Sequence, residues 1–145
     1  MGLPDPDNLP RRIEEALRSR TEILEAYLFG SRARQDSHAL SDIDVAVFLD
    51  RSDLAETAFG YRAELASSLM TALATDAVDV VILNEAPPLL YHRVLRDGIR
   101  LFSRDLAATT TREGRALSRY CDYAVQLRKI DAAHSARIAA GAFGR

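Results

Sequence analysis

The fold of this 145-residue chain is decided by the stretch GSRARQDSHALSDIDVAVFL, which spans Gly30–Leu49, and by the apolar run Ala26–Phe29 directly before it. Ile43–Leu49 has the composition of a buried strand. Side chains alternate between the two faces of a strand, so Asp42 and Asp44 are predicted to share one face, roughly 6.5 Å apart. The opposite face is then expected to carry the apolar side chains Val45, Val47 and Leu49.

The polar residues of this stretch favour a particular chemistry. Two carboxylates on one face repel each other unless a cation lies between them, and their oxygens are ligands that suit Mg²⁺. Gly30 and Ser31 follow a strand, where their backbone N–H groups and the hydroxyl suit a phosphate. Each half of the pattern is common alone, since an Asp-x-Asp pair is often only the solvated face of a sheet. Together they indicate phosphoryl or nucleotidyl transfer.

Three further residues extend the candidate site. Asp79 lies inside the predicted strand Val78–Leu83, where a lone carboxylate is costly unless it is paired or bound to a metal, so we interpret it as a third ligand. Arg32 and Arg34 flank the Gly-Ser turn. They either steady a triphosphate or are exposed helix charges. The histidines are predicted to lie too far apart for a metal site: His38, His92 and His134.

The spacing Gly-Ser-x10-Asp-x-Asp is the signature of the polymerase-β-like nucleotidyltransferases. The sequence from Leu28 to Val47 resembles that of their minimal prokaryotic branch, the MNT-type (MntA-like) antitoxins that accompany HEPN-domain toxins. The segments Asp79–Leu90 and Arg93–Gly98 are similar to the same branch, and the resemblance covers about residues 24–128. Gln35 departs from the family, which usually has Gly there, but this change removes no ligand.

The resemblance implies an activity and a partner. Asp42, Asp44 and Asp79 would hold two Mg²⁺ ions and act in catalysis. The triphosphate of ATP would be bound by Gly30, Ser31, Arg32 and Arg34. AMP would pass from ATP to a tyrosine of a HEPN ribonuclease toxin, which neutralises the toxin within a hetero-oligomeric complex.

Two other functions stay open beside this one. The first is a small-molecule nucleotidyltransferase of the aminoglycoside-modifying type, which usually needs added helices or a partner subunit to build its acceptor pocket. The second is a non-catalytic module that neutralises a toxin by steric cover. The intact set of three aspartates argues against a purely steric module.

Length and composition fit one domain over residues 1–145, with residues 1–8 and about 132–145 expected to be loose, and the resemblance implies that it is a nucleotidyltransferase domain. The resemblance implies the polymerase-β-like fold, an α/β (α+β) arrangement of a small mixed sheet of about four strands flanked by helices. The chain is 48% apolar and 28% charged, and it shows neither an apolar run of membrane-spanning length nor a signal peptide. Cys121 is the only cysteine, so no internal disulfide is expected and a cytoplasmic location is favoured.

Hydrophobic periodicity predicts the remaining elements. Strands are expected over 23–29, 43–49, 78–83 and 99–102, and helices over 8–20, 54–72, 87–97 and from about 111 to 131. Ser31–Gln35 is predicted to form a short helical turn, and Gly98 to end its helix as a left-handed cap. Thr110-x-x-Glu113 has the pattern of a capping box at the start of the last helix.

The last helix is predicted to have two faces. One is an apolar stripe expected to enter the core, formed by Leu117, Tyr120, Cys121, Ala124, Leu127 and Ile130. The other is basic, with Arg112, Arg115, Arg119, Arg128 and Lys129. The net charge is −2 overall but +4 over residues 104–145, and this basic part is either a solvated helix face or a surface that meets an acidic protein partner, which we expect rather than nucleic acid.

Overall fold

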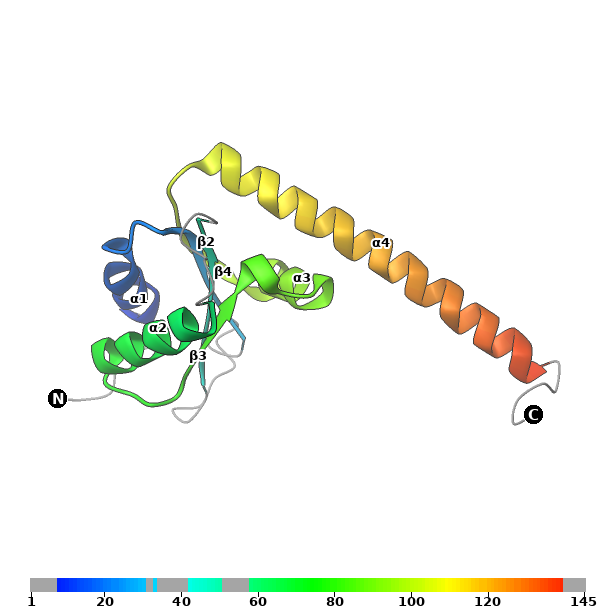
Figure 1. The fold of residues 1–145 in the computed structure, drawn as a ribbon, viewed down its shortest axis with the longest axis horizontal. Coiled ribbons are helices and arrows are strands. Elements are labelled where there is room, and N and C mark those ends of the chain that lie inside the picture. The colour runs from blue at the N-terminus through cyan, green and yellow to red at the C-terminus, as the bar shows by residue number, and fades with distance from the viewer. Residues whose placement is uncertain (1–7, 31–32, 34–41, 51–57, 140–145) are drawn as a thin grey trace.

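A four-stranded mixed sheet forms the centre of the molecule (Figure 1). In this computed structural model, residues 8–30, 33, 42–50 and 58–139 are described. The strands are β1 Ile23–Phe29, β2 Ile43–Leu49, β3 Val78–Ile82 and β4 Ile99–Ser103, in the order β3-β2-β1-β4. β2 and β3 are parallel, whereas β1 is antiparallel to both β2 and β4. This arrangement confirms the predicted α/β class.

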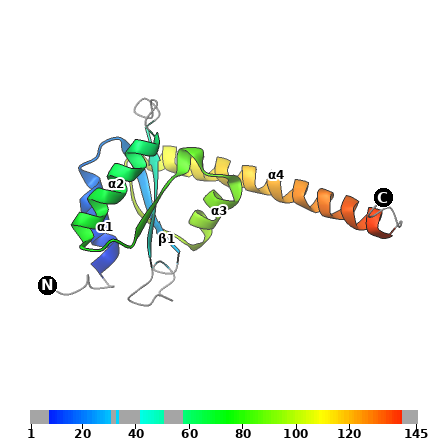
Figure 2. The same ribbon diagram turned by 60° about the horizontal axis from the view of Figure 1, so that its bottom comes forward.

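Helices cover both faces of the sheet (Figures 1 and 2). α1 (Leu9–Arg18) and α2 (Ala58–Leu73) lie on one face, and α3 (Pro88–Asp97) and the start of α4 (Leu106–Ala139) lie on the other. A short 3-10 turn, η3 (Leu83–Glu85), joins β3 to α3. No helix in the described ranges has the length and apolar character needed to cross a bilayer.

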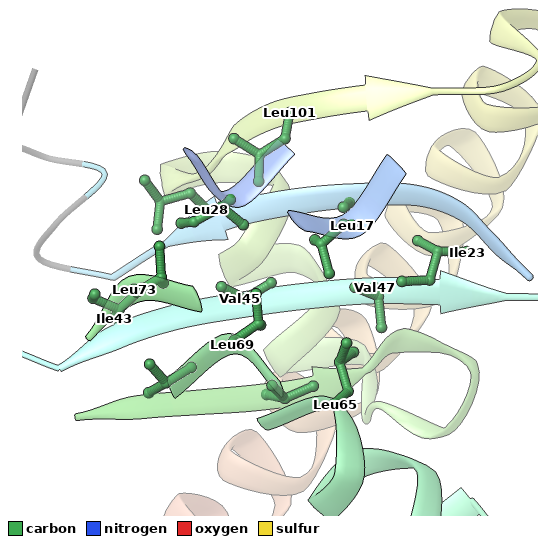
Figure 3. Packing of buried hydrophobic residues seen from close by; sticks show 14 of the residues in the cluster. Leu17, Ile23, Leu28, Ile43, Val45, Val47, Leu65, Leu69, Leu73 and Leu101 are labelled. Atoms are coloured by element: carbon green, nitrogen blue, oxygen red, sulfur yellow. The ribbon is translucent and has the colours of Figure 1, made fainter. Parts of the chain in front are cut away.

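The larger core lies between the sheet and the pair α1–α2 (Figure 3). It contains Val45 and Val47 of β2, as the alternation predicts, together with leucines of both helices: Leu9, Leu17, Leu65, Leu69 and Leu73. The smaller core lies under α3 and contains Ala46, Tyr91 and Val94. Asp44 is on the same face as Ala46, so β2 presents its aspartate on the face that α3 covers.

Several predicted boundaries shift by one or two residues. α1 ends at Arg18, two residues before the predicted end, and β3 ends at Ile82 because Leu83 already begins the 3-10 turn. In α2 the inward stripe runs through Leu73, and Ala72 is exposed. Leu89 of α3 is exposed as well.

Gly98 is not a left-handed cap. Its backbone is extended, with φ −87° and ψ 165°, and its N–H donates to the Val94 carbonyl oxygen at 2.8 Å. A Cβ at this position would lie 2.3 Å from that oxygen and 3.1 Å from the carbonyl oxygen of Leu28. Glycine is therefore required here chiefly by the nearby Val94 carbonyl at the end of α3, and further by β1, rather than by a positive φ angle.

The largest differences concern α4. It begins at Leu106, where the Asp105 carboxylate accepts a hydrogen bond from the backbone N–H of Ala108 at 3.2 Å, so Asp105 is the cap. Thr110 lies inside the helix and donates to the carbonyl oxygen of Leu106 at 2.9 Å, so it caps nothing. The helix continues to Ala139 rather than ending near residue 131. Most of its predicted core stripe is exposed: Leu117, Cys121, Leu127 and Ile130.

Candidate active site

Two of the three predicted carboxylates are paired by the register of the sheet. Asp44 on β2 and Asp79 on β3 are direct partners across the parallel pair, and both lie where their strands begin. Asp42 comes two residues before Asp44, at the same end of the sheet. Asp42 and Asp79 are exposed and Asp44 is half-buried. The desolvation cost expected for an aspartate within an apolar strand is thus avoided at Asp79.

The charges of the neighbouring aspartates act on Asp44. Burial raises the pKa of the Asp44 carboxyl above its ordinary value, and the negative charges of Asp79 and Asp42 raise it further. A like charge disfavours ionisation only when it is near. The pKa direction therefore supports the grouping that the register indicates, with Asp44 at its centre.

Gly30 is placed against this group by the antiparallel pairing of β1 with β2. Phe29 is the register partner of Asp44, so Gly30 leaves β1 directly beside the carboxylate. Its φ angle is +77°, in the region that favours glycine. A Cβ on residue 30 would lie 2.3 Å from the Asp44 Oδ2 atom. The predicted phosphate-binding glycine and the predicted metal ligand are therefore adjacent.

The other predicted phosphate ligands, Ser31, Arg32 and Arg34, lie outside the described residues, as does Gln35 and hence most of the predicted turn Ser31–Gln35. Their roles stay predictions.

The described residues contain no ready-made metal cluster. No group of three or more His, Cys, Asp or Glu side chains among them is arranged to hold an ion. The donor set at the start of β2 and β3 nevertheless fits a hard divalent cation, because it consists of carboxylate oxygens whose mutual repulsion such a cation relieves. Of the histidines, His92 stacks on Tyr120 with ring centroids 3.6 Å apart and His134 lies on α4, whereas His38 lies outside the described residues.

Sequence reasoning missed a buried ionic group beneath α4. Glu25 of β1 is 0% exposed and accepts hydrogen bonds from the Arg112 guanidinium at 2.7 and 2.5 Å and from the Thr109 hydroxyl at 3.0 Å. Arg112 was predicted to belong to the exposed basic face, but it faces the sheet and lies over the Phe48 ring at 4.8 Å. The available signal was Glu25 itself, because a charged residue within a buried strand needs a partner.

A second link holds the start of α4 on the same face of the sheet. Tyr27 of β1 donates to the Glu113 carboxylate at 3.0 Å, and Arg100 of β4 binds the other oxygen of that carboxylate at 2.9 Å. Burial raises the pKa of the Tyr27 hydroxyl, and the Glu113 charge adds to this effect. The first two turns of α4 are therefore fixed to the sheet by charged hydrogen bonds more than by apolar packing.

Comparisons with known proteins point to one family. Residues 11–107 match the family described as polymerase beta, nucleotidyltransferase. No curated protein sequence matches the chain. Among solved structures, a toxin–antitoxin crystal structure with AMP-PNP contains a chain that is 27% identical, with a TM-score of 0.67. The match covers 87% of this chain and 98% of that one.

Two more solved structures are informative. One is the tri-AMPylated HEPN toxin of Shewanella oneidensis in complex with MNT antitoxin, matched at 25% identity and a TM-score of 0.65, covering 90% of this chain and 99% of that chain. The other is described as a proposed minimal nucleotidyltransferase, with 30% identity and a TM-score of 0.54, covering 66% of this chain and 94% of that chain.

Proposed function

The chain belongs to the polymerase beta nucleotidyltransferase family, and from this we propose that it is an antitoxin that transfers AMP from ATP to a tyrosine hydroxyl of a HEPN toxin in an Mg²⁺-dependent reaction. The observation that carries the proposal is the convergence of Gly30, Asp42, Asp44 and Asp79 at one end of the sheet. Support for the acceptor comes from the similar structure in which a HEPN toxin is tri-AMPylated.

Each residue has a part that follows from its position. The backbone of Gly30, with Ser31, Arg32 and Arg34 beyond it, would hold the β- and γ-phosphates of ATP. Asp42 and Asp44 would hold two Mg²⁺ ions, and Asp79 would complete the ligand set on the acceptor side. Bound Mg²⁺ supplies neutralisation of the phosphate charge and orients the α-phosphate for in-line attack.

The transfer itself is a single displacement at phosphorus. The tyrosine oxygen forms a bond to the α-phosphorus while the bond from that phosphorus to the oxygen bridging to the β-phosphate breaks, and pyrophosphate leaves with the electron pair. The tyrosine proton passes to a base, and Asp79 is the candidate because its side chain is exposed beside Asp44. The protein's contribution is placement and charge neutralisation.

The test uses the purified protein, its co-encoded toxin and α-labelled ATP. We expect label on the toxin, located on a tyrosine by peptide mass spectrometry, and no label when the divalent ion is chelated or when Asp44→Asn replaces the wild type. Asp76→Asn is the matched control, since Asp76 is exposed at the same end of the sheet but is not among the charges that raise the pKa of Asp44. Neutralisation of the toxin without any label would instead support a steric module, and label on a small molecule would support the aminoglycoside-type alternative.

A further inference from the structure

α4 is much longer than the surface on which it packs. Its 34 residues span about 50 Å, whereas its packing partner α3 has only ten residues. Figures 1 and 2 show the second half of α4 leaving the body of the molecule with no other element beside it. The covered face of the first half is formed by Thr109, Arg112, Ala116 and Tyr120, at steps of three and four residues.

The same face continues beyond the body as a row of apolar side chains. Steps of three and four lead from Tyr120 to Tyr123, Leu127, Ile130 and, after His134, Ile138. We call Tyr123, Leu127, Ile130 and Ile138 the distal stripe. Their exposed fractions are 36%, 41%, 62% and 49%. Residues three and four apart lie on one side of a helix, so the stripe is one continuous surface in line with the packed face.

Such a stripe is the recognised signature of a helix that buries one face against another element. Within the described part of the chain no element covers it. A partner protein that binds an amphipathic helix also contacts such an apolar row, through side chains at positions i, i+3, i+4 and i+7. The stripe therefore indicates an intermolecular contact rather than a core.

We propose that the distal stripe is the docking surface for an apolar helix or groove of the toxin, an inference that rests on the proposed function. The similar chains occur in toxin–antitoxin structures, and the match to one of them covers 90% of this chain. Even if every uncovered residue were C-terminal, that match would extend to roughly residue 130, so the projecting helix as far as about that residue belongs to the part that this chain shares with that protein.

The direction of α4 fits this occupant. α4 starts at the end of the sheet opposite the carboxylates and slants back toward the carboxylate end as it leaves the body (Figure 1). Its packed face lies over the sheet face that carries Asp44, and the stripe continues that face. A toxin bound along the stripe would thus lie beside α3, on the side of the molecule that carries Asp44.

The test compares two glutamates placed two residues apart. Leu127→Glu puts a charge in the stripe, and the matched control Val125→Glu puts one on the opposite side of the helix, where Val125 is 44% exposed. Glutamate is a good helix former, so α4 should persist in both variants, which circular dichroism verifies. We expect Leu127→Glu to weaken binding of the co-encoded toxin about tenfold or more and Val125→Glu to change it less than about threefold.

The outcomes separate docking from catalysis. Equal toxin affinity of wild type and Leu127→Glu overturns the docking surface, even if the toxin is still labelled. Lost affinity in Leu127→Glu supports it, even if the wild type transfers no AMP and the proposed activity fails. Light scattering of the protein without toxin tests whether the stripe instead binds a second copy of this chain. If the wild type is a dimer, Leu127→Glu is a monomer and toxin binding is unchanged, the stripe is a dimer interface and the proposal is overturned.

Discussion

Gly30 and Asp44 are in contact across the β1–β2 pair, and the contact leaves no room for a side chain at residue 30. A Cβ atom on residue 30 would lie 2.3 Å from the Asp44 Oδ2 atom and 3.2 Å from its Cγ. Because Asp44 also faces Asp79 across the β2–β3 pair, this one contact joins the proposed phosphate-binding turn to the carboxylate group. The geometry of the site depends on both residues together.

Replacing Gly30 with alanine should therefore reduce transfer far more than stability. The methyl group must displace the Asp44 carboxylate, and a non-glycine residue at φ +77° costs on the order of 1–2 kcal/mol. We expect a loss of AMP transfer of about a hundredfold or more, because a misplacement of about 1 Å has that effect. Urea unfolding and toxin labelling measure the two quantities. A variant that labels the toxin at the wild-type rate would contradict the role of this contact.

Asp44→Asn should change how stability depends on pH. The pKa of Asp44 is raised in the folded state, so the folded protein binds more protons than the unfolded chain at pH values between the ordinary pKa of about 4 and the raised one. Stability is therefore lost as the pH rises through that window, and the cost persists at neutral pH. The asparagine variant lacks this cost and should be the more stable protein at pH 7.

Thermal melts from pH 3.5 to 7.5 test this, with Asp76→Asn as the control that keeps the carboxylate group intact. Added Mg²⁺ and ATP should stabilise the wild type and the control more than Asp44→Asn, since a ligand stabilises the form that binds it. If the melting temperatures of all three proteins change equally with pH, with and without ligands, Asp44 is not the centre of a group of mutually repelling carboxylates.

Arg112→Ala should be the most destabilising of these substitutions. It leaves the fully buried Glu25 carboxylate without its cation, and breaking a buried pair typically costs about 3–5 kcal/mol. The double substitution Glu25→Met with Arg112→Met should recover most of that loss, because it leaves no unpaired charge. Arg11→Ala, which breaks the exposed pair with Glu15, should cost at most about 1 kcal/mol. Urea unfolding of the wild type and these three variants measures the free energies of unfolding. Equal losses of stability in Arg112→Ala and Arg11→Ala would contradict the prediction.

The carboxylate end of the sheet was predictable in part, because some of its signals are local. The alternation of Ile43–Leu49 fixes the face of Asp44, whereas Asp79 comes beside it through the parallel pairing with Val78–Ile82, which is not a local signal. Gly30 follows from its position at the end of β1. What the sequence could not supply was the contact between Gly30 and Asp44, since it depends on the register of β1 against β2, and alternation alone does not set that register.

The prediction of α4 failed for a different reason. Periodicity shows that Leu127 and Ile130 share a helix face, but it cannot show whether an element of the same chain covers that face. The same limitation put Arg112 on the exposed face of the helix, because an arginine is assigned to the solvent side until its buried partner Glu25 is known. Sequence reasoning was thus reliable for the two faces of the strand Ile43–Leu49 and unreliable for which side of α4 the rest of the chain covers.

The last prediction concerns the exposed basic residues that remain on α4. Arg115 and Arg119 are both exposed and one helical turn apart, on a side of the helix next to the distal stripe. Reversing both to glutamate should slow association with the toxin about tenfold at low salt, because charges near an interface act mainly on the encounter rate. ATP binding should be unchanged. Leu127→Glu should instead act mainly on the dissociation rate, because it alters packed contacts.

Stopped-flow association at several salt concentrations separates this steering from a general effect of net charge. The control Arg11→Glu with Arg18→Glu makes the same charge change on α1, which covers the other face of the sheet. The wild-type rate should fall as salt rises, since screening at physiological ionic strength acts beyond about 8 Å, and the difference between wild type and the α4 reversal should shrink with it. If the α1 and α4 reversals slow association equally, the effect belongs to the overall charge and the Arg115–Arg119 surface does not steer the toxin.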